Sequence, residues 1–323
     1  MSAPAHTPDD LVRGLHWAAT DTGTDRVAAA LARLLREAEH LGGDHVSLRT
    51  MNLLVAPHAG PVPPVPHDGG SRAEMALHPA RLVRLARHDA DRLDAEVRVR
   101  LVRVGEAHID VLVEDVHLRA DEDRLAHASS LIAPLLARGI PTVAWLPGCD
   151  HGAVAAALSV TAHVTVFDSD RDPDPARALA FAHATALEHP SRDLAWLRTR
   201  SWRQRISAAF EPEDARSLLA FAPSAHVVGD PASPAALLLA GWIAARADVN
   251  VSLSPGTGAE PVEAVTIAGR AVAPRSGAAC DTAILSQALD TVYSAPRGYE
   301  DALRNLGRRF PWGVQGKGVP VGQ

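Results

Sequence analysis

The chain has 323 residues, enough for two domains of about 150 residues that each bury a core. Hydrophobic residues make up 47% and charged residues 22%, as in ordinary globular proteins. The formal net charge is −6, from 38 acids and 32 bases, so no overall positive charge favours nucleic acid or an anionic membrane. We therefore expect neither as a partner.

The lack of a recognisable targeting signal and the small number of cysteines predict a cytoplasmic protein. The first residues, Met1 to His6, lack the basic and apolar stretches of a secretory signal, and no apolar run reaches the ~18 residues of a membrane span. Two cysteines, Cys149 and Cys280, are too few for a disulfide framework. Cys149 follows a predicted turn, which leaves a redox role open. No basic neighbour within the turn would activate it, so we expect both thiols to be reduced.

In the first third of the chain, apolar periodicity predicts a helix over 25–41 that packs on the first sheet, then a buried strand over 51–56. Proline and glycine predict a surface loop over 57–70. Period-two alternation predicts three further strands, over 82–86, 95–104 and 109–118. Gly105-Glu106 between the last two suggests a hairpin or neighbouring strands.

Helical and strand patterns alternate in the middle of the chain. A helix is expected over 121–138, with a kink at Pro134. Strands over 142–146 and 164–167 enclose an alanine-rich helix over 152–158, which favours parallel pairing. The first sheet is therefore expected to be mixed.

The second half begins with a polar run over 168–175, which is typical of a solvated linker and leads into a helix at Ala176. Long helices are expected over 194–210 and 235–247. Short strands that would form a second sheet are expected over 227–228, 249–253 and 262–272. The fold class predicted is α/β, with two subdomains that each have a small mixed sheet and packed helices.

These patterns suggest four segments: an N-terminal helical extension (1–44), an N-terminal α/β domain (45–170), a C-terminal α/β domain (171–307) and a flexible tail (308–323).

The segment from Asp193 to Arg203 concentrates two of the six tryptophans and several charged groups in eleven residues. Indole and guanidinium side chains dominate hot spots of protein–protein interfaces. A simpler interpretation is an amphipathic helix in which Trp202, Ile206 and Phe210 form the buried stripe. Both interpretations remain open for Trp202.

The pattern D-L-x-W-x-R-x-x-x-W-R from Asp193 to Arg203 resembles the glucose-6-phosphate dehydrogenase assembly protein family, OpcA. The segment from Leu135 to Gly148 is similar to that family's leucine-rich helix end and P-V-V-x-W-W-P-G strand, with Leu146 in place of the second Trp. Further similarities occur, in the same order, at His78–Arg81, at Arg92–Arg98 and from Ser233 to Ile243. The resemblance covers about residues 45–250.

The resemblance implies a non-enzymatic assembly factor or allosteric activator of glucose-6-phosphate dehydrogenase, which would promote the active oligomer and so support NADPH supply in the oxidative pentose phosphate pathway. It implies no cofactor. The partner-binding residues that we predict are Trp145, Asp193, Trp196, Arg198, Trp202 and Arg203. A divergent paralogue with another protein partner is the nearest alternative.

The sequence lacks the motifs of common enzymes. It has no G-x-G-x-x-G after a predicted strand, no P-loop, no H-E-x-x-H, no paired C-x-x-C and no G-x-S-x-G. One enzyme-like feature is Asp168-Ser169-Asp170, which follows a predicted strand, where α/β folds place ligand sites. Asp168 and Asp170 could hold a divalent cation and, through it, a nucleotide-sugar. We expect a linker and no metal there.

A nucleic-acid interpretation would stack bases on Trp196 and Trp202 beside the arginines of the same segment, Arg198, Arg200, Arg203 and Arg205. The overall acidity of the chain argues against it.

Overall fold

A computed structural model describes residues 14–40, 45–46, 49–57, 78–104, 109–147, 152–220, 224–272, 281–290 and 298–309. The chain divides into two compact units, Met1–Thr165 and Val166–Gln323. Cys149, Cys280, most of the predicted loop over 57–70 and residues 310–323 lie outside the described residues.

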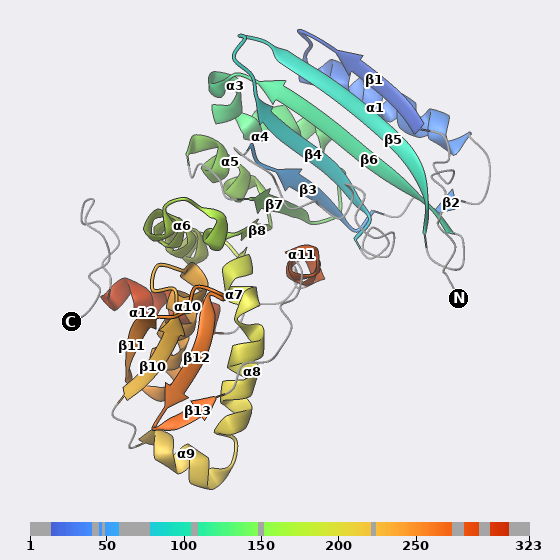
Figure 1. The fold of residues 1–323 in the computed structure, drawn as a ribbon. Coiled ribbons are helices and arrows are strands. Elements are labelled where there is room, and N and C mark those ends of the chain that lie inside the picture. The colour runs from blue at the N-terminus through green and yellow to red at the C-terminus, as the bar shows by residue number, and fades with distance from the viewer. Residues whose placement is uncertain are drawn as a thin grey trace. The chain divides into compact units, whose positions relative to one another are not determined.

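The first unit contains a mixed sheet, as the sequence predicts (Figure 1). Its strands are β1 (Gly14–Ala19), β2 (His45–Val46), β3 (Met51–Val55), β4 (Ala80–Arg87), β5 (Leu93–Val104), β6 (Ile109–Ala120), β7 (Thr142–Leu146) and β8 (Val164–Phe167). The order is β1-β5-β6-β4-β3-β7-β8-β9, where β9 is Ser191–Asp193, and β2 pairs with β6. β3, β4, β6 and β7 pair in parallel, whereas β1, β5 and β6 pair antiparallel.

The burial of the strands follows the two apolar patterns in the sequence, alternating and unbroken. β5 alternates: Val97 and Val99 are buried, while Arg98 between them is exposed. β3 and β7 are buried at every position, as expected for parallel strands covered on both faces. The predicted pairing of the strands on either side of Gly105-Glu106 is confirmed, because β5 and β6 form a long antiparallel pair.

The helices of the first unit are α1 (Thr24–Glu39), α3 (Glu122–Ala126), α4 (Ala128–Ile132), the 3-10 helix η1 (Ala133–Leu135) and α5 (Ala153–Thr161). The apolar face of α1, with Val27, Leu31 and Leu34, is buried and packs against β5 and η1, so this helix belongs to the first unit.

The prediction of one kinked helix over 121–138 is wrong. Asp121 caps α3 by accepting a hydrogen bond from the Arg124 amide, but the helix ends at His127, whose φ and ψ are −105° and 31°. α4 then passes into η1 at Pro134, because proline lacks an amide donor and its ring clashes with the preceding helical turn. The chain becomes extended at Leu136.

The second unit has a smaller sheet in the order β11-β10-β12-β13. β10 (Ser224–Gly229) pairs in parallel with β11 (Asn250–Pro255) and antiparallel with β12 (Val262–Ile267), and β12 pairs antiparallel with β13 (Arg270–Val272). Both units are therefore mixed α/β, and the predicted fold class is confirmed. The single strand predicted over 262–272 is instead two strands, because Ala268 and Gly269 have positive φ and turn the chain.

The other elements of the second unit are η2 (Ser169–Arg171), α6 (Pro175–Glu188), β9 (Ser191–Asp193), α7 (Leu194–Arg198), α8 (Arg200–Ala209), α9 (Glu213–Ala220), α10 (Pro234–Ala247), α11 (Asp281–Asp290) and α12 (Tyr299–Arg309). α10 is buried from Pro234 to Ala244 and packs against α12, α7, β10 and β11. It is the central helix of this unit (Figure 1).

The single helix expected over 194–210 is also two helices. Thr199 separates α7 from α8, and its hydroxyl donates a 2.8 Å hydrogen bond to the Trp196 carbonyl oxygen. That bond satisfies a carbonyl at the end of α7. Among the described residues, none of the helices is both long and apolar enough to cross a bilayer.

Candidate functional site

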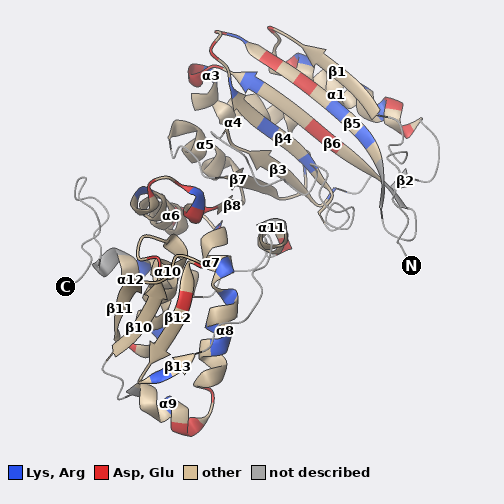
Figure 2. Ribbon diagram, viewed as in Figure 1, with Lys and Arg blue, Asp and Glu red and all other residues tan. Residues whose placement is uncertain are grey.

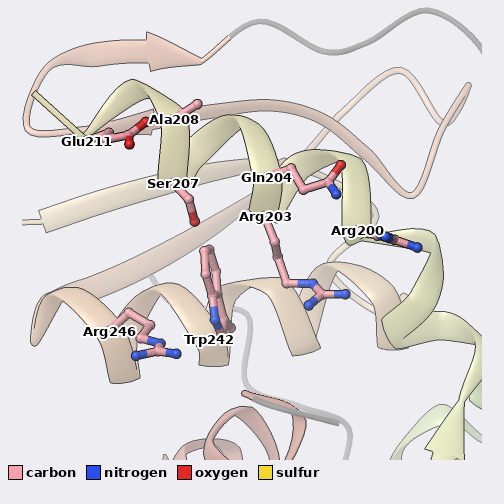
Figure 3. A pocket seen from close by; sticks show the side chains of 8 residues that line it. All are labelled: Arg200, Arg203, Gln204, Ser207, Ala208, Glu211, Trp242 and Arg246. Carbon is pink, nitrogen blue, oxygen red and sulfur yellow. The ribbon is translucent and has the colours of Figure 1, made fainter. Parts of the chain in front are cut away.

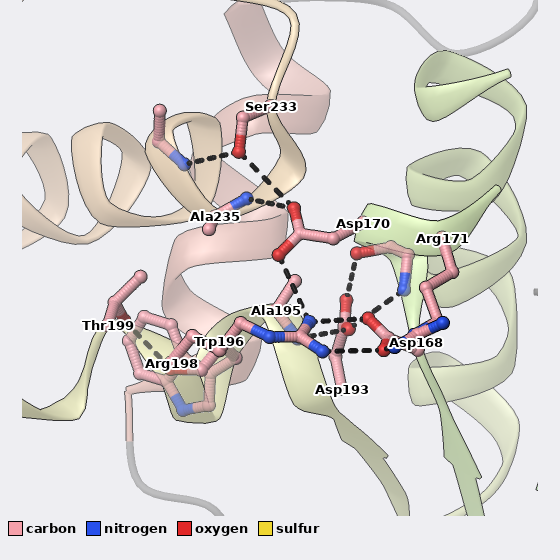
Figure 4. A network of polar contacts seen from close by, with 12 residues as sticks. Asp168, Asp170, Arg171, Asp193, Ala195, Trp196, Arg198, Thr199, Ser233 and Ala235 are labelled. Atoms are coloured by element: carbon pink, nitrogen blue, oxygen red, sulfur yellow. Dashed lines mark hydrogen bonds and ion pairs between the residues drawn. The ribbon is translucent and has the colours of Figure 1, made fainter. Parts of the chain in front are cut away.

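A buried ion pair joins the turn after β8 to the end of α7. The two terminal nitrogens of Arg198 donate to the two carboxylate oxygens of Asp168 at 2.6 and 2.7 Å (Figure 4). The Asp168 side chain is fully buried, whereas that of Arg198 is 19% exposed. Arg171 adds a second cation, with Nε 3.3 Å from Asp168 Oδ2. In the run expected to be a solvated linker, Asp168, Ser169 and Asp172 are buried. Arg171, Pro173 and Asp174 are exposed, so the expectation is wrong for the first part of the run only.

Asp170 extends this cluster to the central helix. One of its oxygens accepts a 3.1 Å hydrogen bond from Arg198, and the other accepts bonds from the Ser233 hydroxyl at 3.2 Å and from the Ala235 amide at 3.1 Å. Ser233 is the N-cap of α10, where unpaired amides and the helix dipole favour a carboxylate. Burial raises the pKa of Asp170, and the guanidinium of Arg198 opposes that rise.

Asp193 is the N-cap of α7, and it also binds Ser169 in the turn after β8. It accepts a 2.9 Å hydrogen bond from the Ala195 amide, and it also accepts bonds from the amide and hydroxyl of Ser169 at 3.2 and 2.6 Å. Complete burial raises the pKa of its carboxyl to about 7, and the neighbouring carboxylate of Asp168 acts in the same direction. The Asp193 carboxyl therefore has a pKa near neutral, although it lies among groups that hydrogen-bond to it.

A stacked aromatic and cationic group lies beside this cluster. The Arg203 guanidinium lies 3.6 Å from the centre of the Trp196 ring, and it donates to the Trp196 carbonyl oxygen at 3.2 Å and to the Thr199 hydroxyl at 3.1 Å. Trp196 also contacts Tyr299 of α12, with ring centroids 5.8 Å apart. Trp196 is therefore a buried anchor between α7, α8 and α12.

The structure places the six predicted partner-binding residues in two different settings. Asp193, Trp196, Arg198, Trp202 and Arg203 gather around α7 and α8, whereas Trp145 is fully buried in β7 of the first unit. The three tryptophans are at most 8% exposed, so nearly all of their ring surface is already covered. Trp202 lies on the buried stripe with Ile206 and Phe210. Direct contact between these side chains and a partner stays a prediction.

The carboxylates of Asp168 and Asp170 are paired with the guanidinium of Arg198 and not arranged around a space for a metal ion. The guanidinium of Arg198 lies between the carboxylates of Asp168 and Asp170, at the place where a shared cation would have to be. Within the ranges that the structure describes, no three His, Cys, Asp or Glu side chains form a group that could hold a metal. The arrangement fixes the positions of α7 and α10 relative to the turn after β8.

Sequence reasoning missed two members of this cluster. In the sequence, Arg171 belongs to a polar run that is typical of a linker, and Ser233 belongs to a segment that resembles the family; neither pattern predicts its contact with the cluster. A signal for Ser233 was present, because serine directly before Pro234 is typical of an N-cap followed by proline at the first helical position. No local signal links Ser233 to Asp170, which lies 63 residues away in the chain.

The fold is thus that of a two-unit α/β protein whose polar cluster is built around internal ion pairs. Residues 72–184 match the family model described as glucose-6-phosphate dehydrogenase subunit N-terminal domain, and residues 189–309 match the one described as its C-terminal domain. The chain therefore belongs to the glucose-6-phosphate dehydrogenase assembly protein family, OpcA. A search of curated proteins gave no significant match.

Proposed function

We propose that the protein is a cytoplasmic, non-catalytic assembly factor that binds glucose-6-phosphate dehydrogenase and activates it allosterically by stabilising its active oligomer. Its role would be in the oxidative pentose phosphate pathway and in NADPH supply. The observation that supports this is the match of both halves of the family, in order, over residues 72–309. A protein that binds the active assembly more tightly than separate subunits shifts the equilibrium by that difference in affinity, with no chemistry of its own.

For the site, we propose that Asp193, Trp196 and Arg198 act through their positions in the buried cluster, by keeping α7 and α8 in one arrangement. Trp145 and Trp202 would contribute in the same indirect way, as buried anchors of their units. Arg203 is only partly buried, and α8 carries several further arginines (Figure 2). We therefore expect the partner to contact this side of the second unit.

The test is to mix the purified protein with its cognate dehydrogenase. The mixture should show more glucose-6-phosphate oxidation than the dehydrogenase alone, and light scattering should detect a larger oligomer. The protein alone should show no oxidation. If the activity and mass of the mixture equal those of the separate components, the proposal is wrong.

A partner other than the dehydrogenase is the alternative for a divergent member of the family. A pull-down from native extract separates the two, because the proposal requires the dehydrogenase to co-purify. The other alternative, a metal-dependent enzyme that binds a nucleotide-sugar through Asp168 and Asp170, has little support, because Arg198 already contacts both carboxylates.

A further inference from the structure

A groove of about 650 Å³ lies between α8 and α10 in the second unit (Figure 3). It is lined by Arg200, Arg203, Gln204, Ser207, Ala208, Glu211, Trp242 and Arg246. This volume is within the usual range for sites that bind small molecules.

Helical spacing brings these side chains to one groove. Arg200, Arg203 and Ser207 follow one another at three- and four-residue steps along α8, and Trp242 and Arg246 are four residues apart on α10. In Figure 3 the Trp242 ring stands between the two helices, with Arg203 and Arg246 on either side of it. The groove therefore combines a mostly buried apolar ring with cationic side chains.

The residues that line the groove carry more positive than negative charge. Three of its lining residues are arginines and one, Glu211, is an acid. In the part of the chain that the structure describes, no carboxylate lies within ion-pair distance of Arg200, Arg203 or Arg246. Among the described residues, the Arg203 guanidinium contacts neutral groups, namely the Thr199 hydroxyl, the Trp196 carbonyl oxygen and the Trp196 ring.

Arg203 on α8 contrasts with Arg198, the last residue of α7. Arg198 contacts two carboxylates, whereas Arg203 is partly buried and no described residue places a carboxylate against it. A charge that is removed from water without a counter-charge is unfavourable. Burial and the nearby charge of Arg200 accordingly lower the pKa of Arg203 to about 10. A bound anion would stabilise the charged guanidinium and so offset both effects.

We propose that this groove binds a small organic phosphate. The phosphate would contact the guanidinium groups of Arg200, Arg203 and Arg246, because planar guanidinium forks match phosphate oxygens with paired hydrogen bonds. Ser207 and Gln204 supply neutral hydrogen-bonding groups, and the edge of Trp242 supplies apolar contact for the rest of the ligand. This site goes beyond the proposed assembly role and does not depend on it.

The direct test is calorimetric titration of the protein alone, at constant ionic strength, with inorganic phosphate, pyrophosphate and glycerol 3-phosphate. We expect saturable binding of at least one of these probes at one site per chain. Arg246→Gln and Arg200→Gln should each weaken binding about 10-fold, since a hydrogen bond to a charged group contributes this much or more. Neither residue belongs to the buried cluster around Asp168.

The matched control is Arg304→Gln. Arg304 lies in the same unit, on α12, and its exposed side chain pairs with Asp301 at 2.9 Å. Its loss should leave phosphate binding unchanged. Thermal melts of all three variants would confirm that they are folded before binding is compared.

Three results would overturn the proposal: no saturation by any probe at millimolar concentration, equal weakening by Arg304→Gln, or tighter binding of a short polyglutamate peptide than of every phosphate probe. The last would assign the groove to an acidic protein segment. The titration uses this chain without the dehydrogenase, so its failure is distinct from failure of the assembly proposal.

Discussion

Arg198 and Asp168 face each other with both guanidinium terminal nitrogens on both carboxylate oxygens, at 2.6 and 2.7 Å. The Asp168 side chain has no exposure to solvent. An ion pair of this kind contributes little net stability compared with apolar residues of similar size, but the loss of one partner leaves a buried charge without compensation. The pair therefore fixes the arrangement of α7 more than it adds to the total stability.

Arg198→Ala should consequently destabilise the second unit by about 3 to 5 kcal/mol, because it leaves Asp168 buried with only Arg171 nearby. Chemical denaturation monitored by tryptophan fluorescence would measure the change. The matched control is Arg304→Ala, which removes an exposed ion pair with Asp301 and should cost less than about 0.5 kcal/mol.

A double substitution, Arg198→Leu with Asp168→Leu, should recover most of the stability lost by Arg198→Leu alone, because it removes both charges together. A double variant as unstable as the sum of the two single variants would show that the two side chains act independently, which contradicts the structure.

The stability of the protein should depend on the protonation of Asp193. Its pKa is raised from 3.8 to about 7 in the folded state, mainly by burial, so between these values the folded chain binds more protons than the unfolded chain. The contribution of this group is therefore complete below about pH 4 and is lost as the pH rises through 7. The free energy of unfolding of the wild type, minus that of Asp193→Asn, should fall by more than ~1 kcal/mol between pH 4.5 and 8.5.

The asparagine variant is a suitable reference, because it keeps the shape of the side chain and an oxygen that can accept the Ala195 amide, and it does not titrate. Carboxyl groups far from Asp193 titrate equally in both proteins and cancel in the difference, whereas Asp168 and Asp170 are coupled to Asp193 and are part of the measured effect. If the difference is constant or grows with pH, Asp193 is ionised in the folded state over the whole range and this account of the cluster is wrong.

Much of the fold could be predicted from the sequence because the signals are local. The alternation in β5, the unbroken apolar strands β3 and β7, and the apolar helix α10 can all be recognised in short windows. The two broken helices could not be predicted in the same way. Apolar spacing continues through His127 and Thr199, while the breaks depend on backbone geometry and on a hydroxyl that bonds a carbonyl oxygen.

The burial of the Asp168 cluster could not be predicted from the sequence, for a different reason. A run of acids such as Asp168 to Asp174 looks like a solvated linker in any short window. The burial of Asp168 depends on its ion pair with Arg198, 30 residues later, and that pairing exists only in the folded unit. For the same reason the sequence could not separate Arg198, which is bound internally, from Arg203, which lines the groove.

Trp202→Ala should cost about 3 to 5 kcal/mol of unfolding free energy, because it leaves a cavity beside Ile206 and Phe210 in the buried stripe of α8. Leu218→Ala is the control, since Leu218 is 51% exposed on α9 and its truncation should cost less than about 1 kcal/mol. Denaturation midpoints of the two variants give the comparison. Similar small losses in both would place Trp202 at the surface, available for direct contact with a partner.

A final prediction concerns Gly298, which precedes α12 and has a φ of 84°. A Cβ atom there would lie 3.2 Å from both Cδ1 and Nε1 of Trp242, the ring that lines the groove between α8 and α10. Gly258 has nearly the same φ, 83°, but a Cβ there would meet nothing within 4 Å. A substitution at Gly258 therefore measures the cost of the backbone conformation alone, and one at Gly298 adds the cost of crowding against Trp242.

Gly258→Ala should cost about 1 kcal/mol, from the left-handed backbone alone. Gly298→Ala should cost about 2 to 4 kcal/mol, because the added methyl group must also displace the Trp242 ring. Thermal unfolding gives the two losses, and titration with phosphate shows whether the groove has changed. Equal losses would mean that Trp242 moves aside without cost. In that case the ring is not held rigidly by the start of α12, and the shape of the groove must be maintained by α8 and α10 alone.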